Sequence, residues 1–348
     1  MLRLSPLDRP RKLTVDFFDC YDRRVELPEN TQPPIPAIAG PTASGKSELG
    51  IGLALRLGGE IINMDSVQVY RGLYVATAKV PQEQQRGIPH HLIDIADPTE
   101  NFTAGEYARR AEAAIREVMA RGRMAILVGG TGFYLRALVQ PLFQSPETDL
   151  GLRDRLRRLL EARGAHHLHR MLGRVDPSSA SLISPRDWSR TMRALEFRFQ
   201  SGERMSRSRP NRPPPPDFAG RFIVIALNPS RADLYSKINA RAERMFQEGL
   251  VEEVQALIDS GVPADAKAFQ AHGYRRVVEY IKGERTLEGA LEQMKLDTRH
   301  YAKRQLSWWR TWPGTRWINR FGSDPESLID ALHYISEATG SMRWVAGI

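Results

Sequence analysis

The chain has 348 residues, 41% of them hydrophobic, which is enough for one large domain or two modest domains with an apolar core. No apolar run reaches the roughly 18 residues of a membrane helix, the first residues lack the apolar segment of a secretory signal, and the single cysteine, Cys20, excludes an internal disulfide. The net charge of +9 suits a polyanionic partner, and we expect a cytoplasmic, monomeric protein without membrane contact.

The first residues of the chain mix charges and prolines with little periodicity, so we expect a poorly ordered N-terminal extension at 1–34. The short apolar run at 35–39 is typical of a buried parallel strand. The next residues, at 40–47, read GPTASGKS and match the pattern G-x-x-x-x-G-K-[ST]. A helical spacing follows and ends at Gly58 and Gly59.

The GPTASGKS segment predicts a phosphate-binding loop, because it follows a strand and precedes a helix as that mechanism requires. Its glycines let backbone N–H groups converge on an anion, and the helix adds the positive end of its dipole. Lys46 would be the cation for the terminal phosphate, and Ser47 would offer its hydroxyl to Mg²⁺. The expected phosphate-binding residues are Gly40, Pro41, Thr42, Ala43, Ser44, Gly45, Lys46 and Ser47.

Two further strands are predicted at 60–66 and 124–130, with a helix between them from about residue 105 to 121. Strands that alternate with helices indicate an α/β fold with a doubly wound parallel sheet, similar to that of P-loop NTPases. Asp65 ends the first of these strands, so it would lie at the carboxyl edge of the sheet, where such folds place their chemistry. It could order Mg²⁺, accept a proton from a nucleophile or cap a turn.

The second of these strands ends in VGGTG, where glycines permit close backbone approach and Thr131 supplies a hydroxyl. Gln68 and Tyr70 fit substrate contacts and turn packing equally well. His90 and His91 lack further ligands at a suitable spacing, so a structural pair is favoured over a metal site.

From residue 147 to 216 the pattern changes to helices without a strand and ends in a linker rich in proline and arginine. Residues 151–217 contain 15 arginines, no lysine and 7 acidic residues, which is nearly the whole surplus of positive charge. Because arginine suits bidentate phosphate contacts, contact with nucleic acid is favoured over a solvated helical surface. The predicted organisation is therefore a core at 35–146 and 217–348 and a helical, arginine-rich insertion at 147–216.

The second part of the core should begin with a buried strand at 221–229 and continue as helices. The expected helices are at 231–248, 250–260, 274–282 and 286–312.

Eight segments have an identity and order that characterise one enzyme family. They are GPTASGKS, MDSVQVYRG, ATAK, PHHLID, VGGTGFYL, RALE, HGYR and TRHYAKRQLSWWR. Over about residues 35–320 the chain resembles the tRNA dimethylallyltransferases, which prenylate an adenosine beside the anticodon. The resemblance implies that the loop holds dimethylallyl diphosphate, with Mg²⁺ as the cofactor. It also implies that the dimethylallyl group passes to N6 of the adenosine 3′-adjacent to the anticodon, with release of diphosphate.

By this resemblance Asp65 corresponds to the general base for the N6 amine, and Thr131 to a threonine that assists at the leaving group or the target base. Arg241 matches an arginine that meets the diphosphate, although a cation on a helix surface is its alternative. Since residues three or four apart share a helix face, Trp308 and Trp309 cannot both face RNA, and at least one should belong to the core. The predicted contacts with the tRNA anticodon arm are Asp65, Ser66, Val67, Gln68, Thr131, Arg153, Ser189, Arg190, Thr191, Met192, Arg193, Gln270, Gly273, Tyr274, Arg275, Lys303, Arg304, Gln305, Trp308 and Arg310.

Three other functions compete with tRNA prenylation. A P-loop small-molecule kinase would bind ATP, a nucleotide, through the same loop, but it needs no basic helical insertion. Prenylation of free adenine nucleotides leaves the insertion unexplained, and a non-enzymatic RNA-binding protein has no use for Asp65 and Thr131 near a phosphate loop. Three residues, Val67, Tyr74 and His272, depart from those usual in the family and concern tRNA contact and substrate fit.

Overall fold

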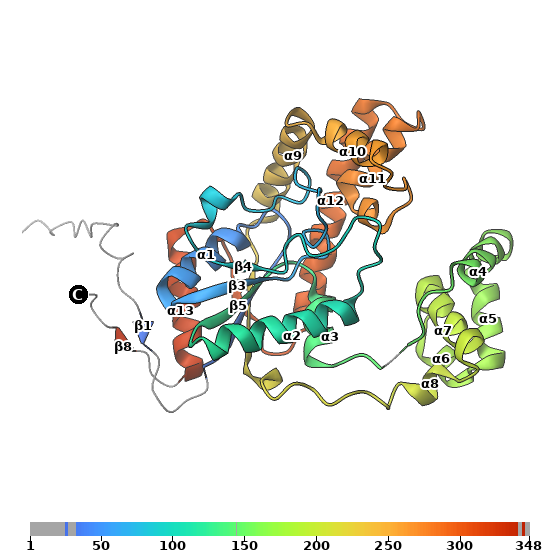
Figure 1. Ribbon diagram of the computed structural model, residues 1–348, viewed down its shortest axis with the longest axis horizontal. Coiled ribbons are helices and arrows are strands. Elements are labelled where there is room, and N and C mark those ends of the chain that lie inside the picture. The colour runs from blue at the N-terminus through green and yellow to red at the C-terminus, as the bar shows by residue number, and fades with distance from the viewer. Residues whose placement is uncertain (1–24, 27–32, 144, 340–342, 345–348) are drawn as a thin grey trace, which may run out of the picture. The chain divides into compact units, whose positions relative to one another are not determined.

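The computed structural model describes residues 25–26, 33–143, 145–339 and 343–344, and the chain divides into two units (Figure 1). The first unit contains residues 1–101, 113–132 and 221–348, and the second contains 102–112 and 133–220. The second unit thus includes the whole of the predicted insertion together with segments beside it. Most of the predicted extension, with Cys20, lies outside the described residues.

The first unit is built on a six-stranded sheet in which all neighbouring strands are parallel. Its strands, in the spatial order β4-β3-β5-β2-β6-β7, are β4 (His90–His91), β3 (Gly59–Asn63), β5 (Met124–Val128), β2 (Ile35–Ala39), β6 (Phe222–Leu227) and β7 (Arg316–Ile318). Every residue of β2, β3 and β5 is buried, as expected for central strands of a parallel sheet that is covered on both faces. A short antiparallel pair, β1 (Val25–Glu26) with β8 (Arg343–Trp344), stands apart from this sheet.

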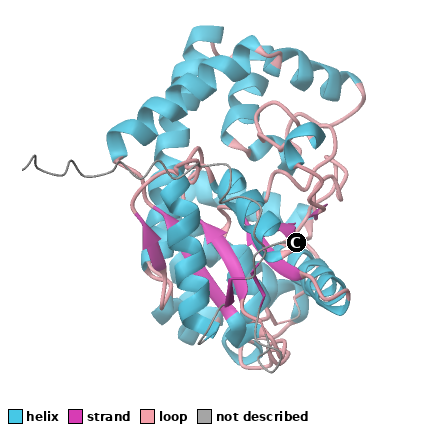
Figure 2. Ribbon diagram, turned by 90° about the vertical axis from the view of Figure 1, so that its left-hand side faces the viewer, coloured by secondary structure: helices cyan, strands magenta, loops and turns pink. Residues whose placement is uncertain are grey.

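Helices lie on both sides of the sheet (Figure 2). On one side α1 (Lys46–Leu57) and α13 (Pro325–Thr339) pack together, and their apolar residues Leu53 and Leu332 join Ile126 and Ile225 of the strands in one core. The remaining helices associated with this unit are α2 (Ala104–Ala120), α9 (Arg231–Gln247), α10 (Leu250–Asp259), α11 (His272–Ile281), α12 (Leu287–Arg310) and the 3₁₀ turns η1 (Gln82–Gln85), η2 (Ala219–Arg221) and η3 (Lys267–Gln270). The doubly wound α/β architecture predicted from the sequence is confirmed.

The second unit is helical and has its own core. Its helices are α3 (Gly132–Val139), α4 (Leu150–Arg163), α5 (Ala165–Val175), α6 (Pro177–Leu182), α7 (Trp188–Ser201) and α8 (Met205–Ser208), with part of α2. Asp149, Asp176 and Asp187 cap the N-termini of α4, α6 and α7 by accepting backbone N–H groups, which fixes where these helices begin. Buried Leu172 and Leu195 belong to the apolar cluster that holds α4 to α8 together.

The strands predicted at 35–39, 60–66, 124–130 and 221–229 are present, and the last three were predicted one to three residues too long where the chain turns. The elements β4, β7, α3 and α13 were not predicted. Among the residues that the structure describes, none of the helices combines the length and apolarity needed to cross a bilayer.

Candidate active site

The phosphate loop follows β2 and enters α1 with the backbone conformation that its glycines allow. Gly40 and Gly45 have φ angles of 134° and 85°, and Ala43 shares the left-handed region at 64°. A Cβ on Gly40 would lie 2.9 Å from Leu227 O, and one on Gly45 would lie 2.9 Å from Gly322 N. Both glycines are therefore required by conformation and by close approach. The loop opens the N-terminus of a 12-residue helix, where free N–H groups favour an anion.

Lys46 is the first residue of α1 and points back over its own loop. Its Nζ donates to Pro41 O at 2.7 Å. Burial lowers the pKa of Lys46 to about 8, while the nearby Asp65 carboxylate opposes this change and the Arg241 guanidinium adds to it. The side chains of Lys46, Asp65 and Arg241 are therefore close enough for their charges to interact.

Asp65 lies two residues after β3, on a turn that Asn63 organises. Asn63 Oδ1 accepts the N–H of Asp65 at 3.1 Å, and its Nδ2 donates to Leu92 O at 2.9 Å. Asp65 Oδ1 accepts the N–H groups of Val67 at 2.9 Å and Gln68 at 3.4 Å. The residue therefore caps a turn, one of its three predicted roles. Within the described part of the chain these bonds use only Oδ1, which leaves Oδ2 to meet a ligand.

Arg241, on α9, is half-buried rather than a cation on an exposed helix surface. Its Nη1 lies 3.5 Å from Thr42 Oγ1 of the phosphate loop. Burial lowers the pKa of Arg241, and Asp65 counteracts this. This position argues against the alternative of a surface cation, and the predicted contact of Arg241 with a diphosphate stays a prediction.

A cavity of about 230 Å³ joins these groups. Its polar lining includes Lys46, Ser47, Asp65, Gln68 and Arg241. Its apolar lining consists of Ala43, Ile61, Ala78, Val80, Ile93 and Val128. Loop, aspartate and arginine thus share one space, as expected from the sequence.

Thr131 lies beside the cavity and is held in a network of hydroxyl groups. Its Oγ1 accepts the N–H of Ser66 at 3.1 Å and lies 3.4 Å from Ser66 Oγ. Tyr301 of α12 forms side-chain hydrogen bonds with Thr131 and Gln305. Burial raises the pKa of Tyr301 and the Asp65 charge raises it further, so the phenol remains protonated.

The glycines of VGGTG are required by the protein's own packing. A Cβ on Gly129 would lie 2.1 Å from Met64 O, and one on Gly130 would lie 1.9 Å from Gln305 Nε2. A Cβ on Gly132 would lie 2.0 Å from Trp308 Nε1. The predicted close approach is confirmed. Gly129 makes room for the backbone of Met64, whereas Gly130 and Gly132 make room for side chains of α12, whose Gln305 contacts the phosphate loop.

Helix α12 contributes a buried residue that supports the phosphate loop and several exposed cations. Gln305 is buried, and its Oε1 accepts the N–H of Thr42 at 2.8 Å. Trp309 is fully buried, which confirms that one of the two adjacent tryptophans belongs to the core, whereas Trp308 is half-buried against Gly132. The exposed candidates for RNA contact on this helix are therefore Lys303, Arg304 and Arg310.

The predicted RNA contacts around α11 likewise divide into exposed and buried residues. Gln270 and Arg275 are exposed. Gly273 is packed against Ala76, and Tyr274 is fully buried. Since the Tyr274 side chain cannot reach RNA from this position, its predicted contact is replaced by a structural role.

In the second unit, Ser189 and Arg190 are exposed, and Arg190 pairs with Asp187 at 2.7 Å. Thr191 and Met192 are buried in the helical core, so their side chains do not offer an RNA contact. The half-buried Arg153 and Arg193 both pair with the buried carboxylate of Glu196. Arg153 Nε lies 2.6 Å from Oε1, and Arg193 Nη1 lies 3.3 Å from Oε2.

Known proteins resemble this chain over most of its length. A model of the family described as IPP transferase matches residues 68–312. A tRNA dimethylallyltransferase from Solibacter usitatus is 46% identical over 312 residues, which are 88% of this chain and 99% of that one. Another, from Koribacter versatilis, is 44% identical over 86% of this chain and 96% of its own length.

The chain belongs to the IPP transferase family. The crystal structure of a tRNA isopentenylpyrophosphate transferase from Bacillus halodurans is 36% identical and matches with a TM-score of 0.65, covering 89% of this chain and 97% of that one. A eukaryotic dimethylallyltransferase acting on tRNA is 28% identical with a TM-score of 0.63, covering 80% of this chain and 70% of that one. The resemblance read from the sequence is confirmed, and these relatives do not favour the kinase alternative.

The His pair is part of the frame of the cavity. His90 and His91 form β4 beside β3, and His91 Nε2 lies 2.7 Å from Glu60 Oε2. His90 Nδ1 lies 2.8 Å from Ile88 O. These contacts agree with the structural role predicted for the pair. Across the described residues, no group of three or more His, Cys, Asp or Glu side chains could hold a metal ion.

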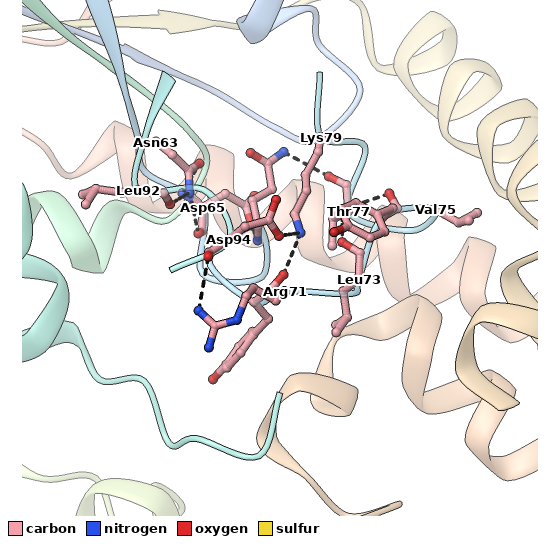
Figure 3. Close-up of polar contacts among 12 residues, drawn as sticks. Asn63, Asp65, Arg71, Leu73, Val75, Thr77, Lys79, Leu92 and Asp94 are labelled. Carbon is pink, nitrogen blue, oxygen red and sulfur yellow. Dashed lines mark hydrogen bonds and ion pairs between the residues drawn. The ribbon is translucent and has the colours of Figure 1, made fainter. Parts of the chain in front are cut away.

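Sequence reasoning missed several residues of the site in this family member. Asn63, Thr77 and His90 line the cavity. Lys79 forms an ion pair with Asp94 at 2.6 Å (Figure 3). The segments ATAK and PHHLID contain four of these five residues and were part of the resemblance, but their spacing does not reveal which side chains face a ligand.

Proposed function

We propose that this protein transfers a dimethylallyl group from dimethylallyl diphosphate to N6 of the adenosine 3′-adjacent to the anticodon in tRNA. Diphosphate is the second product. The observation that carries the proposal is the shared cavity, in which Lys46 and Arg241 lie with the Asp65 carboxylate and an apolar wall. Such a space suits a donor with a charged head and a hydrocarbon tail.

The phosphate loop takes the diphosphate head. The bond between the allylic carbon and oxygen breaks with its electron pair on the departing oxygen, so negative charge grows there. Loop N–H groups, Lys46 and Arg241 are fixed in place to stabilise that charge as it develops. The allylic carbon can tolerate electron loss because its positive charge is delocalised.

The apolar part of the lining takes the five-carbon tail. Ile61, Val80, Ile93 and Val128 are available for this contact. Ile61 and Val128 are buried, and this apolar lining keeps water away from the electron-poor carbon, which protects it from hydrolysis.

Asp65 acts on the acceptor. The lone pair of the N6 amine is delocalised into the adenine ring, so the amine is a weak nucleophile. As the C–N bond forms, Asp65 accepts the N6 proton through the oxygen that is not committed to the turn. Charge and atoms then balance as a prenylated adenosine, a protonated carboxyl and a diphosphate.

Mg²⁺ is proposed as the cofactor, and the Ser47 hydroxyl would help to hold it. Ser47 and Asp65 line the same cavity, and oxygen ligands of this kind suit the ion. When bound, Mg²⁺ would neutralise part of the diphosphate charge.

The acceptor is proposed to be the anticodon arm of tRNA, with the target base turned out of its stack, as enzymes that modify bases require. Support comes from exposed cations on α12 and from the arginine-rich second unit. We further propose that the protein works as a monomer in the cytoplasm, and its mass in solution would test the first of these points.

Incubation with labelled dimethylallyl diphosphate, Mg²⁺ and unmodified tRNA tests the proposal. We expect acid-stable label in the RNA and release of diphosphate. Label in free adenine nucleotides instead of tRNA, or ADP formed from ATP without any labelled RNA, would assign the protein a different reaction.

A further inference from the structure

One wall of the cavity is held by side chains of α10 and α11. Glu253 accepts the backbone N–H groups of Tyr74 at 2.9 Å and Val75 at 3.0 Å. Tyr274 donates its hydroxyl to Glu253 Oε1 at 2.7 Å and accepts the N–H of Ala76 at 3.3 Å. Three consecutive N–H groups are therefore tied to one carboxylate and one phenol.

The same wall holds Gln68 on its cavity side. Gln68 Nε2 donates to Thr77 O at 3.0 Å and Ala78 O at 3.3 Å, and all three residues line the cavity. The backbone N–H of Gln68 donates in turn to Asp65 Oδ1, beside the N–H of Val67. A continuous set of hydrogen bonds thus runs from the wall to the catalytic carboxylate proposed above, with Asp65 and Thr77 both visible in Figure 3.

Tyr274 is suited to a fixed contact. It is fully buried, and its ring centroid lies 6.3 Å from that of Phe269. The ring therefore packs against an aromatic neighbour, while the hydroxyl bonds to other residues, Glu253 and Ala76. Burial raises the pKa of Tyr274 and the Glu253 carboxylate raises it further, which keeps the phenol protonated and able to donate. A buried group of this kind is costly to leave without its partner.

We propose that Glu253 and Tyr274 are positioning residues that fix the cavity wall and, through Gln68, the carboxylate of Asp65. The inference rests on the proposed function, since it assigns their purpose through the role of Asp65 as base. Neither residue belongs to the lining of the cavity, so they act through the wall rather than on the donor.

Tyr274→Phe tests the inference because it removes the hydroxyl and keeps the ring. Tyr280→Phe, on the same helix, is the matched control. Hydrogen exchange should become about tenfold faster at the amides of residues 74–76 in Tyr274→Phe, with a smaller increase at 67–68, and should be unchanged in the control. Glu253→Gln should reproduce the pattern, with the exposed Glu252→Gln as its control.

A fall in kcat without a change in the KM for the donor would distinguish a positioning role from general destabilisation of the protein. With saturating tRNA and donor, kcat should fall about tenfold in Tyr274→Phe, while the KM for dimethylallyl diphosphate stays within about twofold of the wild-type value. The donor is held by Lys46 and its loop, which these substitutions leave intact.

Unchanged exchange at 67–68 in both variants would overturn the inference, and so would a raised donor KM with an unchanged kcat. Absence of prenyl transfer by the wild-type protein would instead refute the proposed function. The exchange measurement would still decide, in that case, whether Glu253 and Tyr274 fix the wall and the Asp65 turn.

Discussion

Lys46 is a cavity residue whose charge depends on its surroundings. Its pKa is lowered to about 8 by burial, although Asp65 lies near enough to oppose the change. A bound diphosphate would add negative charge beside the ammonium and raise this pKa again. Donor binding should therefore be linked to the protonation of Lys46.

The linkage predicts how affinity for dimethylallyl diphosphate depends on pH. The ammonium form binds the donor, so affinity is complete below the pKa of about 8 and declines as pH rises above it. Calorimetric titration should show Kd increasing about tenfold from pH 7 to pH 9. Lys46→Met should bind weakly with little change over the same range; an equally steep pH dependence in that variant would assign the effect to another group.

At the same residue scale, the sequence predicted the residues that carry the chemistry better than it predicted which residues contact RNA. Lys46, Asp65 and Arg241 were predicted from motif and resemblance, and the structure brings them to one cavity. Gln305 and Tyr274 were assigned to RNA, yet both are buried and brace the site. A spacing of three or four residues defines a helix face, but only long-range packing decides whether that face is covered.

At the scale of elements, the connection between β7 and α13 supports the phosphate loop. Gly322 N donates to Ser44 O at 2.8 Å, and a Cβ on Gly322 would lie 2.2 Å from Gly45 O. The side chain of Ser44 is itself fully buried. The loop is thus pressed between its own strand and a segment almost 280 residues further along the chain.

Gly322→Ala should displace the phosphate loop because the added methyl group meets backbone rather than a flexible side chain. We expect donor affinity to fall on the order of tenfold to a hundredfold, while affinity for tRNA is retained. Gly220→Ala, where an added Cβ would meet nothing within 4 Å, is the matched control. Wild-type donor affinity in Gly322→Ala would show that this connection does not shape the loop.

The elements that were predicted carry a local sequence pattern, whereas the short strands that were missed depend on pairing with a neighbour. Long periodic segments such as α9 and α12 and the buried run of β2 were predicted, because each carries its own signal. β4 has two residues and β7 has three, and each is a strand only through its pairing with a neighbour. The order of the strands in the sheet likewise depends on contacts that no local pattern contains.

At the scale of the whole molecule, positive charge is concentrated between residues 151 and 217. The net charge of the chain is +9, and this segment contributes most of it. Arg155, Arg158, Arg163 and Arg170 are exposed on α4 and α5. Their distribution fits a surface that meets a phosphate backbone.

Replacing these four arginines with alanine should weaken tRNA binding and reduce its dependence on salt. The slope of log K against log salt concentration should decrease by up to about 0.9 for each RNA phosphate that the protein no longer neutralises. The same positions changed to lysine keep their charge and should keep most of the slope. An unchanged slope in the alanine variant would place the main RNA-binding surface elsewhere.

The central claim of the proposed function is that diphosphate departure and proton removal from the acceptor amine take place in one cavity, and Asp65→Asn tests this claim most directly. The measurement is the single-turnover rate of prenyl transfer, with tRNA and dimethylallyl diphosphate both bound. We predict a fall of roughly a hundredfold to ten-thousandfold, because the amide cannot accept the N6 proton while its oxygen can still cap the turn. A rate equal to that of the wild-type protein would contradict the assignment of Asp65 as the base.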